Sequence, residues 1–369
     1  HHFRHRRLAA QIAPPLRHLS PQVSALSPQP SSLKSQPSAL KSQPSALPLM
    51  QRRRFIKILA SSAAALSLGQ LSAARTVASL QPVIWRGYTL GAEGSFTLYT
   101  EDRTSAQTVL KHCFAEIRRL ESLFSLYQPN SELCQLNRTG RLDAPAPEWQ
   151  ALLDAAGQAH QLSQGLFDPT IQPLWQAYAQ HFEQSPNATA GPSQAALGAA
   201  LARTGWQHLN YDADTIQFDQ PNMQLTLNGI AQGFITDHIS NILSNAGYQH
   251  VLVELGETRA IGPHPEQRPW SIGIKDAQQP EQIHEVAELD NQALATSGSY
   301  GSLFSTNGNY HHLLDPISGR PSTRWQSLSV IAPTATQADA LSTGLSFASA
   351  AQITQIERAH SQLRILKQQ

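Results

Sequence analysis

This chain of 369 residues has little cysteine, and its N-terminal part has no acidic residue. The two cysteines, Cys113 and Cys134, are too few for a disulfide framework. No acidic residue precedes Glu93. Residues 1–57 hold ten of the 27 Lys and Arg and none of the 26 Asp and Glu, which leaves a net charge of −9 on the rest. This acidic remainder argues against binding to nucleic acid.

Long hydrophobic runs are absent as well. The uncharged run 58–74 is rich in Ala and Ser and falls short of the roughly 20 apolar residues that a membrane span requires. It follows the sequence RRRFIK at 52–57, and a basic segment before a short apolar one is typical of a secretory signal. Paired arginines ahead of Phe-Ile-Lys indicate the twin-arginine export machinery, which carries folded proteins. We therefore expect residues 50–74 to be a twin-arginine signal peptide and the mature protein to be soluble and periplasmic.

Two other interpretations of the N-terminal region fit less well. A basic amphipathic surface helix is weakened by the lack of acidic residues before Glu93. A lipoprotein anchor is unsupported, because no Cys follows the apolar run. Upstream, LKSQPSA at 33–39 recurs at 40–46, and such a Pro- and Ser-rich repeat cannot bury a core. Since Met50 stands just before the basic run, we expect residues 1–49 to result from a misplaced start codon or to be a disordered leader.

Residues 75–369 mix helical and strand patterns without a regular βαβ rhythm. Apolar residues recur at helical spacing over 104–127, behind a cap at Thr104 or Ser105. Further helices fit 148–163, 193–204, 229–246 and 336–350, and Gly247 is placed to end the helix at 229–246. Strands fit 94–99, 223–227, 250–255, 270–274 and 328–331, and a surface loop fits 187–193. This order predicts an α+β fold with helices flanking a largely antiparallel sheet, as one large domain or two intimate lobes.

Candidate chemistry gathers in the turns between these elements. Asp168 stands in an Asp-Pro turn after a helix, and Gly229 opens a stretch of small residues where the backbone can approach a ligand. Asp339 and Thr343 are four residues apart on a helix, so their oxygens share one face. A carboxylate with neutral oxygens suits Mg²⁺ bound to a phosphate. His312 precedes a turn and carries a side chain that can act as a base.

Each of these motifs also has a structural interpretation. Asp168 fits an ordinary Asp-Pro turn. The hydroxyl of Thr343 can bond back to the preceding turn of its helix, and His312 can be a structural histidine. The glycines around Gly229 lack the full dinucleotide-binding fingerprint and the acidic residue that follows it, so a Rossmann fold is weakly indicated. Taken singly, none of these motifs decides a function.

Together and in this order, the motifs resemble those of the FAD:protein FMN transferases, the ApbE flavin transferase family. Seven landmarks between Gly87 and Ala350 carry the resemblance: LGA at 90–92, ESLFSLY at 121–127 with SEL at 131–133 and Asn137, GLFDPT at 165–170, GIAQGF at 229–234 with Asp237, ATSGSY at 295–300, HLLDPISG at 312–319 and ADALST at 338–343. The resemblance implies an enzyme that binds FAD with Mg²⁺ and moves the FMN moiety to a Thr or Ser hydroxyl of an acceptor flavoprotein, releasing AMP. Residues 75–369 would form this flavin transferase domain.

The resemblance also implies roles for individual residues. His312 would take the proton from the acceptor hydroxyl, because an imidazole titrates near working pH. Asp339, Thr343 and the backbone carbonyl of Gly229 would hold Mg²⁺ beside the pyrophosphate. Eight residues would line the FAD site: Leu90, Tyr127, Leu166, Phe167, Asp168, Thr226, Gln232 and Leu313. Among these, Tyr127 would pack against a ring, and Asp168 would accept hydrogen bonds from the ligand.

The chain departs from the family pattern at three places. Residues 90–92 read Leu-Gly-Ala where the family usually has Met-Gly-Thr, Gln232 stands where Lys or another polar residue is common, and Gly256 is followed by Glu257 where a second glycine is usual. Two other classes therefore stay open. An FAD pyrophosphatase would use the same metal and base, with water in place of the acceptor hydroxyl. A non-catalytic periplasmic flavin-binding protein would need no base, so the retained base and metal ligands argue against it.

Overall fold

A seven-stranded sheet organises the computed structural model, which describes residues 80–369. The predicted leader at 1–49 and signal peptide at 50–74 lie outside the described residues. The strand order is β1-β2-β6-β7-β10-β11-β12, and each neighbouring pair is antiparallel. These strands are β1 Gln81–Thr89, β2 Ala92–Thr100, β6 Val251–Glu254, β7 Thr258–Ile261, β10 Ala293–Gly298, β11 Ser327–Ala332 and β12 Arg364–Gln368.

Two small antiparallel sheets accompany the main one. The first has the order β3-β5-β4, and the second pairs β8 with β9. Their strands are β3 Arg141–Asp143, β4 Leu209–Tyr211, β5 Thr215–Phe218, β8 Trp270–Lys275 and β9 Ile283–Leu289. The predicted α+β fold with a largely antiparallel sheet is confirmed. The described residues belong to one compact unit, which is the first of the two predicted forms.

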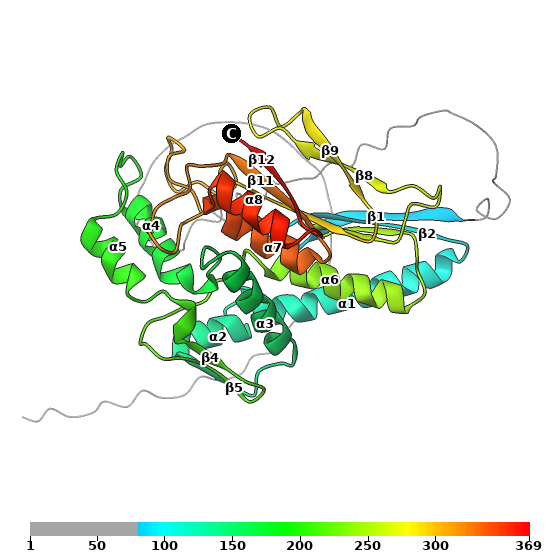
Figure 1. The fold of residues 1–369 in the computed structure, drawn as a ribbon. Coiled ribbons are helices and arrows are strands. Elements are labelled where there is room, and N and C mark those ends of the chain that lie inside the picture. The colour runs from blue at the N-terminus through cyan, green and yellow to red at the C-terminus, as the bar shows by residue number, and fades with distance from the viewer. Residues whose placement is uncertain (1–79) are drawn as a thin grey trace, which may run out of the picture. The chain divides into compact units, whose positions relative to one another are not determined.

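Helices cover one face of the main sheet, and the β8–β9 hairpin packs on the other (Figure 1). The helices are α1 Arg103–Phe124, α2 Glu132–Thr139, α3 Glu148–Leu162, α4 Gln172–Gln184, α5 Gln194–Leu201, α6 Ala231–Asn245, α7 Ala335–Gly344 and α8 Ala350–Ala359. The larger core joins α1, α3, α6 and α7 to the sheet, whereas a smaller core lies under β8 and β9. No described helix has the length and apolar character needed to cross a membrane.

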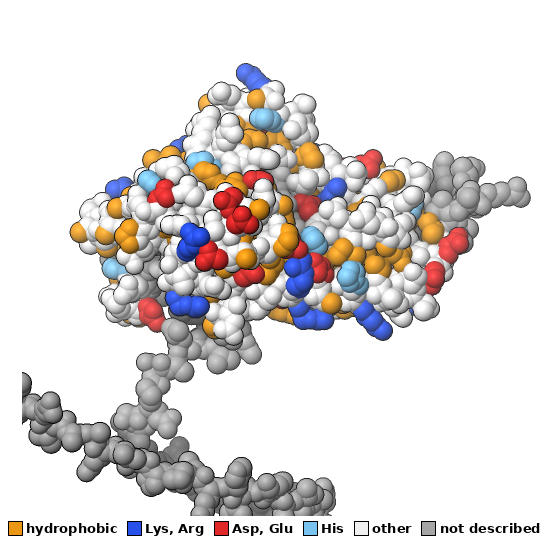
Figure 2. All heavy atoms as spheres, turned by 90° about the horizontal axis from the view of Figure 1, so that it is seen from below, with side chains coloured by type: hydrophobic (Ala, Val, Ile, Leu, Met, Phe, Trp, Pro, Cys, Tyr) orange, Lys and Arg blue, Asp and Glu red, His pale blue; other side chains and the backbone are white. Residues whose placement is uncertain are grey.

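On the face of the molecule shown in Figure 2, Lys and Arg side chains are interspersed with Asp and Glu. This face therefore offers no continuous basic surface.

The structure corrects three details of the sequence prediction. The cap of α1 is Asp102, whose carboxylate accepts the Ser105 N–H at 2.9 Å, so the cap is not Thr104 or Ser105. Residues 223–227 form no strand. The side chain of Asn137 instead takes the part of a strand partner, because it donates to Leu225 O at 2.8 Å and accepts from Leu225 N at 2.7 Å.

The third correction concerns the predicted helix at 336–350. It ends at Gly344, and α8 begins separately at Ala350. Nearly every residue of α7 is buried, so the helix has no polar face from which its length could be read. The helices α2 and α4 escaped prediction altogether. A proline at the start of α4 resembles a helix breaker, although the first turn tolerates it.

Helices α6 and α7 approach each other closely. A Cβ atom at Gly233 would lie 2.2 Å from the carbonyl oxygen of Ala335, so only glycine fits at this contact. The carboxylate of Asp237 on α6 accepts the N–H groups of Ala335 and Thr336 at 2.9 and 2.8 Å, and thereby satisfies the first turn of α7. These contacts fix the position of α7, which carries two of the predicted metal ligands.

Candidate active site

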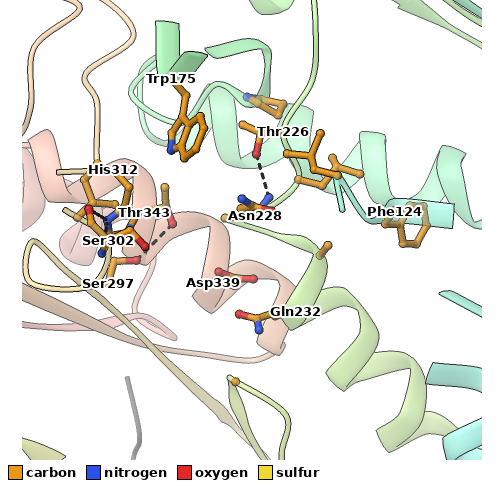
Figure 3. Close-up of a pocket in the computed structure, with 18 of the residues that line it drawn as sticks. Phe124, Trp175, Thr226, Asn228, Gln232, Ser297, Ser302, His312, Asp339 and Thr343 are labelled. Carbon is orange, nitrogen blue, oxygen red and sulfur yellow. Dashed lines mark hydrogen bonds between the residues drawn. The ribbon is translucent and has the colours of Figure 1, made fainter. Parts of the chain in front are cut away.

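A cavity of about 460 Å³ lies between α1, α6, α7 and the loop 299–322, and part of its lining is drawn in Figure 3. The residues that the sequence predicted for the site all line this one cavity: Leu90, Tyr127, Leu166, Phe167, Asp168, Thr226, Gly229, Gln232, His312, Leu313, Asp339 and Thr343. Segments more than 200 residues apart in the chain therefore meet at this cavity. The roles assigned to these residues stay predictions.

Three residues at one corner of the cavity carry oxygen atoms that can bind a metal ion: Gly229, Asp339 and Thr343. We call these three residues the cation corner. One oxygen of Asp339 accepts the Gly233 N–H at 2.9 Å. A Cβ atom at Gly229 would lie 2.9 Å from Thr343 Oγ1, so the backbone of Gly229 abuts that hydroxyl. A carboxylate, a hydroxyl and a carbonyl are donors that Mg²⁺ accepts, and further positions would remain for phosphate oxygens. The donor chemistry of this corner therefore fits the ion.

Charge at this corner also favours a cation. The pKa of Asp339 is raised to about 7, mainly by burial and also by nearby Asp237. The hydrogen bond from the Gly233 N–H acts in the opposite direction. Burial and the neighbouring Asp339 hold the pKa of Glu257 well above its usual range. The described residues contain no cluster of three or more His, Cys, Asp or Glu that would hold a metal by themselves. A hard cation would supply the positive charge that this corner lacks, and neutral oxygens would serve as its remaining ligands.

His312 lies in the loop 299–322 and is held by the backbone of Ser302. Its own N–H donates to Ser302 O at 2.9 Å, and its Nδ1 lies 3.3 Å from the same oxygen and 3.2 Å from Ser302 N. The hydrogen bond that the Ser302 N–H donates to Nδ1 is made by the tautomer with hydrogen on Nε2. The tautomer with hydrogen on Nδ1 instead donates to the Ser302 carbonyl, and it is the one that leaves Nε2 able to accept a proton. A Cβ atom at Gly301 would lie 2.9 Å from the His312 ring, so the loop backbone packs directly against the imidazole.

The pKa of His312 differs from the sequence prediction. The pKa of His312 is lowered to about 4, mainly by burial and also by neighbouring His311. The hydrogen bond to the Ser302 carbonyl acts in the opposite direction. The imidazole is therefore neutral at pH 7 and does not titrate near working pH. A neutral imidazole is the form that can accept a proton.

Asp168 is engaged within the protein. One of its oxygens accepts the N–H and hydroxyl of Thr170 at 2.8 and 2.6 Å, and the other accepts the Trp206 N–H at 3.0 Å. Burial raises the pKa of Asp168, and these three hydrogen bonds oppose the rise. The carboxylate thus caps the short helical turn Pro169–Ile171. A bond to a ligand would have to use its remaining lone pairs.

The remaining predicted lining residues lie on α6 and in the turns and loops between elements. Tyr127 is 53% exposed and lines the cavity. Gln232 on α6 donates to Leu90 O at 3.5 Å and so joins the helix to the β1–β2 turn. That turn has positive φ at Leu90 and Gly91, 53° and 76°, as expected for a two-residue hairpin turn. Thr226 is held through its N–H, which donates to Pro169 O at 2.8 Å.

Sequence reasoning missed several lining residues, among them Glu121, Trp175, Glu257, Ser297 and Ser302. Glu121 and Ser297 belong to landmarks of the resemblance, so those motifs contained the signal. Glu257 was noted only as a departure from the family pattern. Trp175 lies in α4, a helix that the sequence did not reveal.

Comparison with known proteins points to one family. A model of the ApbE family matches residues 90–366. The FAD:protein FMN transferase of Vibrio cholerae serotype O1 is 31% identical over 250 residues, which are 66% of this chain and 73% of that protein. The Chlamydia pneumoniae protein of the same name is 29% identical over 259 residues, 68% and 78% of the two chains.

Solved structures agree with the sequence comparison. The flavin transferase ApbE from Vibrio cholerae superposes with a TM-score of 0.68 at 25% identity and covers 78% of this chain and 93% of its own. The ApbE protein from Thermotoga maritima gives a TM-score of 0.69 at 26% identity, over 78% of this chain and 94% of its own.

Proposed function

The chain belongs to the ApbE family, and we propose that it transfers the FMN moiety of FAD to a Thr or Ser hydroxyl of an acceptor flavoprotein, with Mg²⁺ bound and AMP released. The observation that supports this most is that one cavity holds both the cation corner and the neutral imidazole of His312. Phosphoryl transfer requires charge neutralisation and positioning, together with a group that receives the proton of the nucleophile.

The reaction exchanges one phosphorus–oxygen bond for another. The acceptor oxygen bonds to the phosphorus of the FMN half, and the bond from that phosphorus to the bridging oxygen breaks. AMP leaves with the bridging oxygen. His312 receives the hydroxyl proton on Nε2, while the Ser302 carbonyl holds the hydrogen on Nδ1 and stabilises the charge that forms.

The cation corner would hold the metal through Asp339, Thr343 and the Gly229 carbonyl. Mg²⁺, when bound, offsets the charge of the pyrophosphate and stabilises the leaving phosphate. The Gly233 N–H orients the Asp339 carboxylate, and close packing at Gly229 fixes the Thr343 hydroxyl. Apolar surfaces of Leu166, Phe167 and Leu313, with the accessible ring of Tyr127, would receive the ring systems of FAD.

The proposed function is tested by comparing the products that form with and without an acceptor protein. Purified protein is incubated with FAD and Mg²⁺, with and without a periplasmic extract, and the products are followed by in-gel flavin fluorescence and chromatography. We expect a covalently fluorescent band and AMP, with little free FMN. Equal FMN and AMP in both samples would indicate a pyrophosphatase. Binding of FAD with no AMP formed would indicate the non-catalytic flavin-binding protein.

We also propose that the protein acts in the periplasm after twin-arginine export, on the basis of residues 52–57. Paired Lys substitutions, Arg52→Lys with Arg53→Lys, keep the charge but remove the arginine pair. Cell fractionation of the full chain should then show the protein retained in the cytoplasm, whereas the unaltered chain is found in the periplasm. Equal export of both chains would reject the twin-arginine route.

A further inference from the structure

A chain of three hydroxyls lies behind the cation corner. Ser297 of β10 belongs to the landmark ATSGSY, to which no role has been assigned above. Its Oγ lies 2.8 Å from Ser342 Oγ and 3.3 Å from Thr343 Oγ1, and Figure 3 shows the latter contact beside Asp339. Ser342 Oγ in turn donates to the backbone carbonyl of Asp339 at 3.0 Å. Both serines are buried, so water does not replace these partners.

The carbonyl at the end of the chain sets the direction of its protons. A carbonyl oxygen only accepts, so in the hydrogen bond to Asp339 O the single proton of Ser342 is used by that carbonyl. The oxygen of Ser342 is then free to accept from Ser297, and the oxygen of Ser297 to accept from Thr343. In this arrangement every hydroxyl proton is used once. The lone pairs of Thr343 Oγ1 consequently face away from Ser297 and are available to the cavity.

The opposite direction would weaken Thr343 as a ligand. If Ser297 donated to Thr343, it would occupy one of the two lone pairs of Oγ1, and the Thr343 proton would need another acceptor or would point toward the cation, which repels it. A metal-bound hydroxyl needs a partner that accepts its proton, just as a metal-bound imidazole needs a partner for its second nitrogen. Ser297 is the side chain within hydrogen-bond distance that can do this for Thr343.

We propose that Ser297 is a positioning residue of the cation corner: it accepts the Thr343 proton and thereby presents the Thr343 oxygen to the metal. This inference rests on the proposed Mg²⁺-dependent function. Ser297 itself acts through Thr343 and does not bind the ion. Its loss should therefore weaken metal binding while leaving the chemical step intact once the metal is saturating.

The neighbouring residue of the same strand provides a matched control. Thr296 Oγ1 lies 2.8 Å from Ser329 Oγ on β11, a hydroxyl pair between β10 and β11 that does not involve Thr343. Ser329 is buried like Ser297. Ser297→Ala and Ser329→Ala thus remove the same atom from two buried sites, of which only the first lines the cavity, and only the first is expected to affect the metal.

The experiment measures binding of Mn²⁺, as a probe for Mg²⁺, by electron paramagnetic resonance of the free ion. We expect Ser297→Ala to weaken Mn²⁺ affinity by about 10- to 100-fold, the usual effect of losing a partner of a metal ligand, and Ser329→Ala to change it by less than about 2-fold. In turnover assays Ser297→Ala should need more Mg²⁺ and regain its kcat at saturation. Equal Mn²⁺ affinity of the two variants would overturn the proposal.

Two further variants distinguish a failure of the role proposed for Ser297 from a failure of the metal site itself. Ser342→Ala breaks the chain at its other end and should also weaken Mn²⁺ binding, so it decides the matter if Ser297→Ala does not fold. Unchanged affinity in that variant would reject the proposed proton direction. Asp339→Asn tests the cation corner itself. If it binds Mn²⁺ as well as the wild type, or if the wild type binds none, the metal site of the proposed function fails and the role of Ser297 fails with it.

Discussion

The cavity has two walls that are held in different ways. The helix wall, formed by α6 and α7, is fixed by close packing at Gly233 and by the bonds from Asp237 to the start of α7. The loop wall, residues 299–322, contains isolated bridges in place of strands, and it holds His312 through the backbone of Ser302. The charged residue Asp339 thus lies on closely packed helices, whereas the base His312 lies on a loop. We expect the two walls to respond differently to substitution.

The largest effect should come from the charged ligand of the helix wall. Asp339→Asn keeps an oxygen that can accept the Gly233 N–H but removes the charge that would hold Mg²⁺. FMN transfer should fall by about 10³-fold or more, with the fold intact. As a control, Asp237→Asn alters a carboxylate outside the cavity and should lower stability more than turnover. Transfer at the wild-type rate in Asp339→Asn, particularly with EDTA present, would end the metal hypothesis.

The base of the loop wall should come next. His312→Ala should lower FMN transfer by about 10²–10⁴-fold, the usual contribution of a general base, while FAD binding is retained. Equilibrium titration with FAD and a transfer assay measure the two effects separately. His284→Ala, at an exposed position of β9, serves as the control and should leave both unchanged. If His312→Ala transfers FMN normally, the histidine is structural.

The walls should also differ in their response to pH. The pKa of His312 is lowered to about 4, so the imidazole is already neutral at pH 6 and the rate at saturating Mg²⁺ should be flat from pH 6 to 8. The pKa of Asp339 is raised to about 7, so below that pH a proton competes with the metal. At limiting Mg²⁺ the rate should therefore fall by about tenfold per pH unit below pH 7.

Rates measured across pH at two Mg²⁺ concentrations check this difference. A rise through pH 6 to 7 that persists at saturating Mg²⁺ would place the titrating group on the loop wall instead, near the ordinary pKa of histidine.

The smallest expected effect tests the packing of the helix wall. Gly229→Ala would place a Cβ atom 2.9 Å from Thr343 Oγ1 and should destabilise the protein by about 1–3 kcal/mol. Gly198→Ala is the matched control, because nothing lies within 4 Å of its added Cβ on the exposed side of α5. In a helix interior this change should stabilise by up to about 1 kcal/mol. Denaturant unfolding measures both, and equal midpoints would contradict the close contact.

Local pattern was sufficient for part of the fold. The helical spacing over 104–127 predicted α1, and Gly247, with φ of 91°, follows the end of α6 as expected. Prediction failed where tertiary partners replaced local ones. The segment 223–227 alternates buried and half-buried residues as a strand does, but its central backbone is bound by the distant side chain of Asn137. Helix α7 is buried on nearly all sides and so shows no helical periodicity.

The candidate site divides along the same line. Spacing singled out Asp339 and Thr343 as candidate ligands, because a pair of oxygens four residues apart leaves a mark in the sequence, and the family resemblance assigned the base to His312. Spacing within one segment carries no information about Ser297 or Glu257, which reach the cavity from other strands and turns.

By itself the sequence determined which chemical groups this protein has and which local elements carry them, because helix periodicity, turns and ligand spacing depend on neighbours along the chain. Only the tertiary structure decided how those groups are charged and aligned. The lowered pKa of His312, the raised pKa of Asp339 and the contacts of Ser297 with Ser342 and Thr343 all arise from burial and from contacts between distant segments. Those conditions exist only after the segments have packed together.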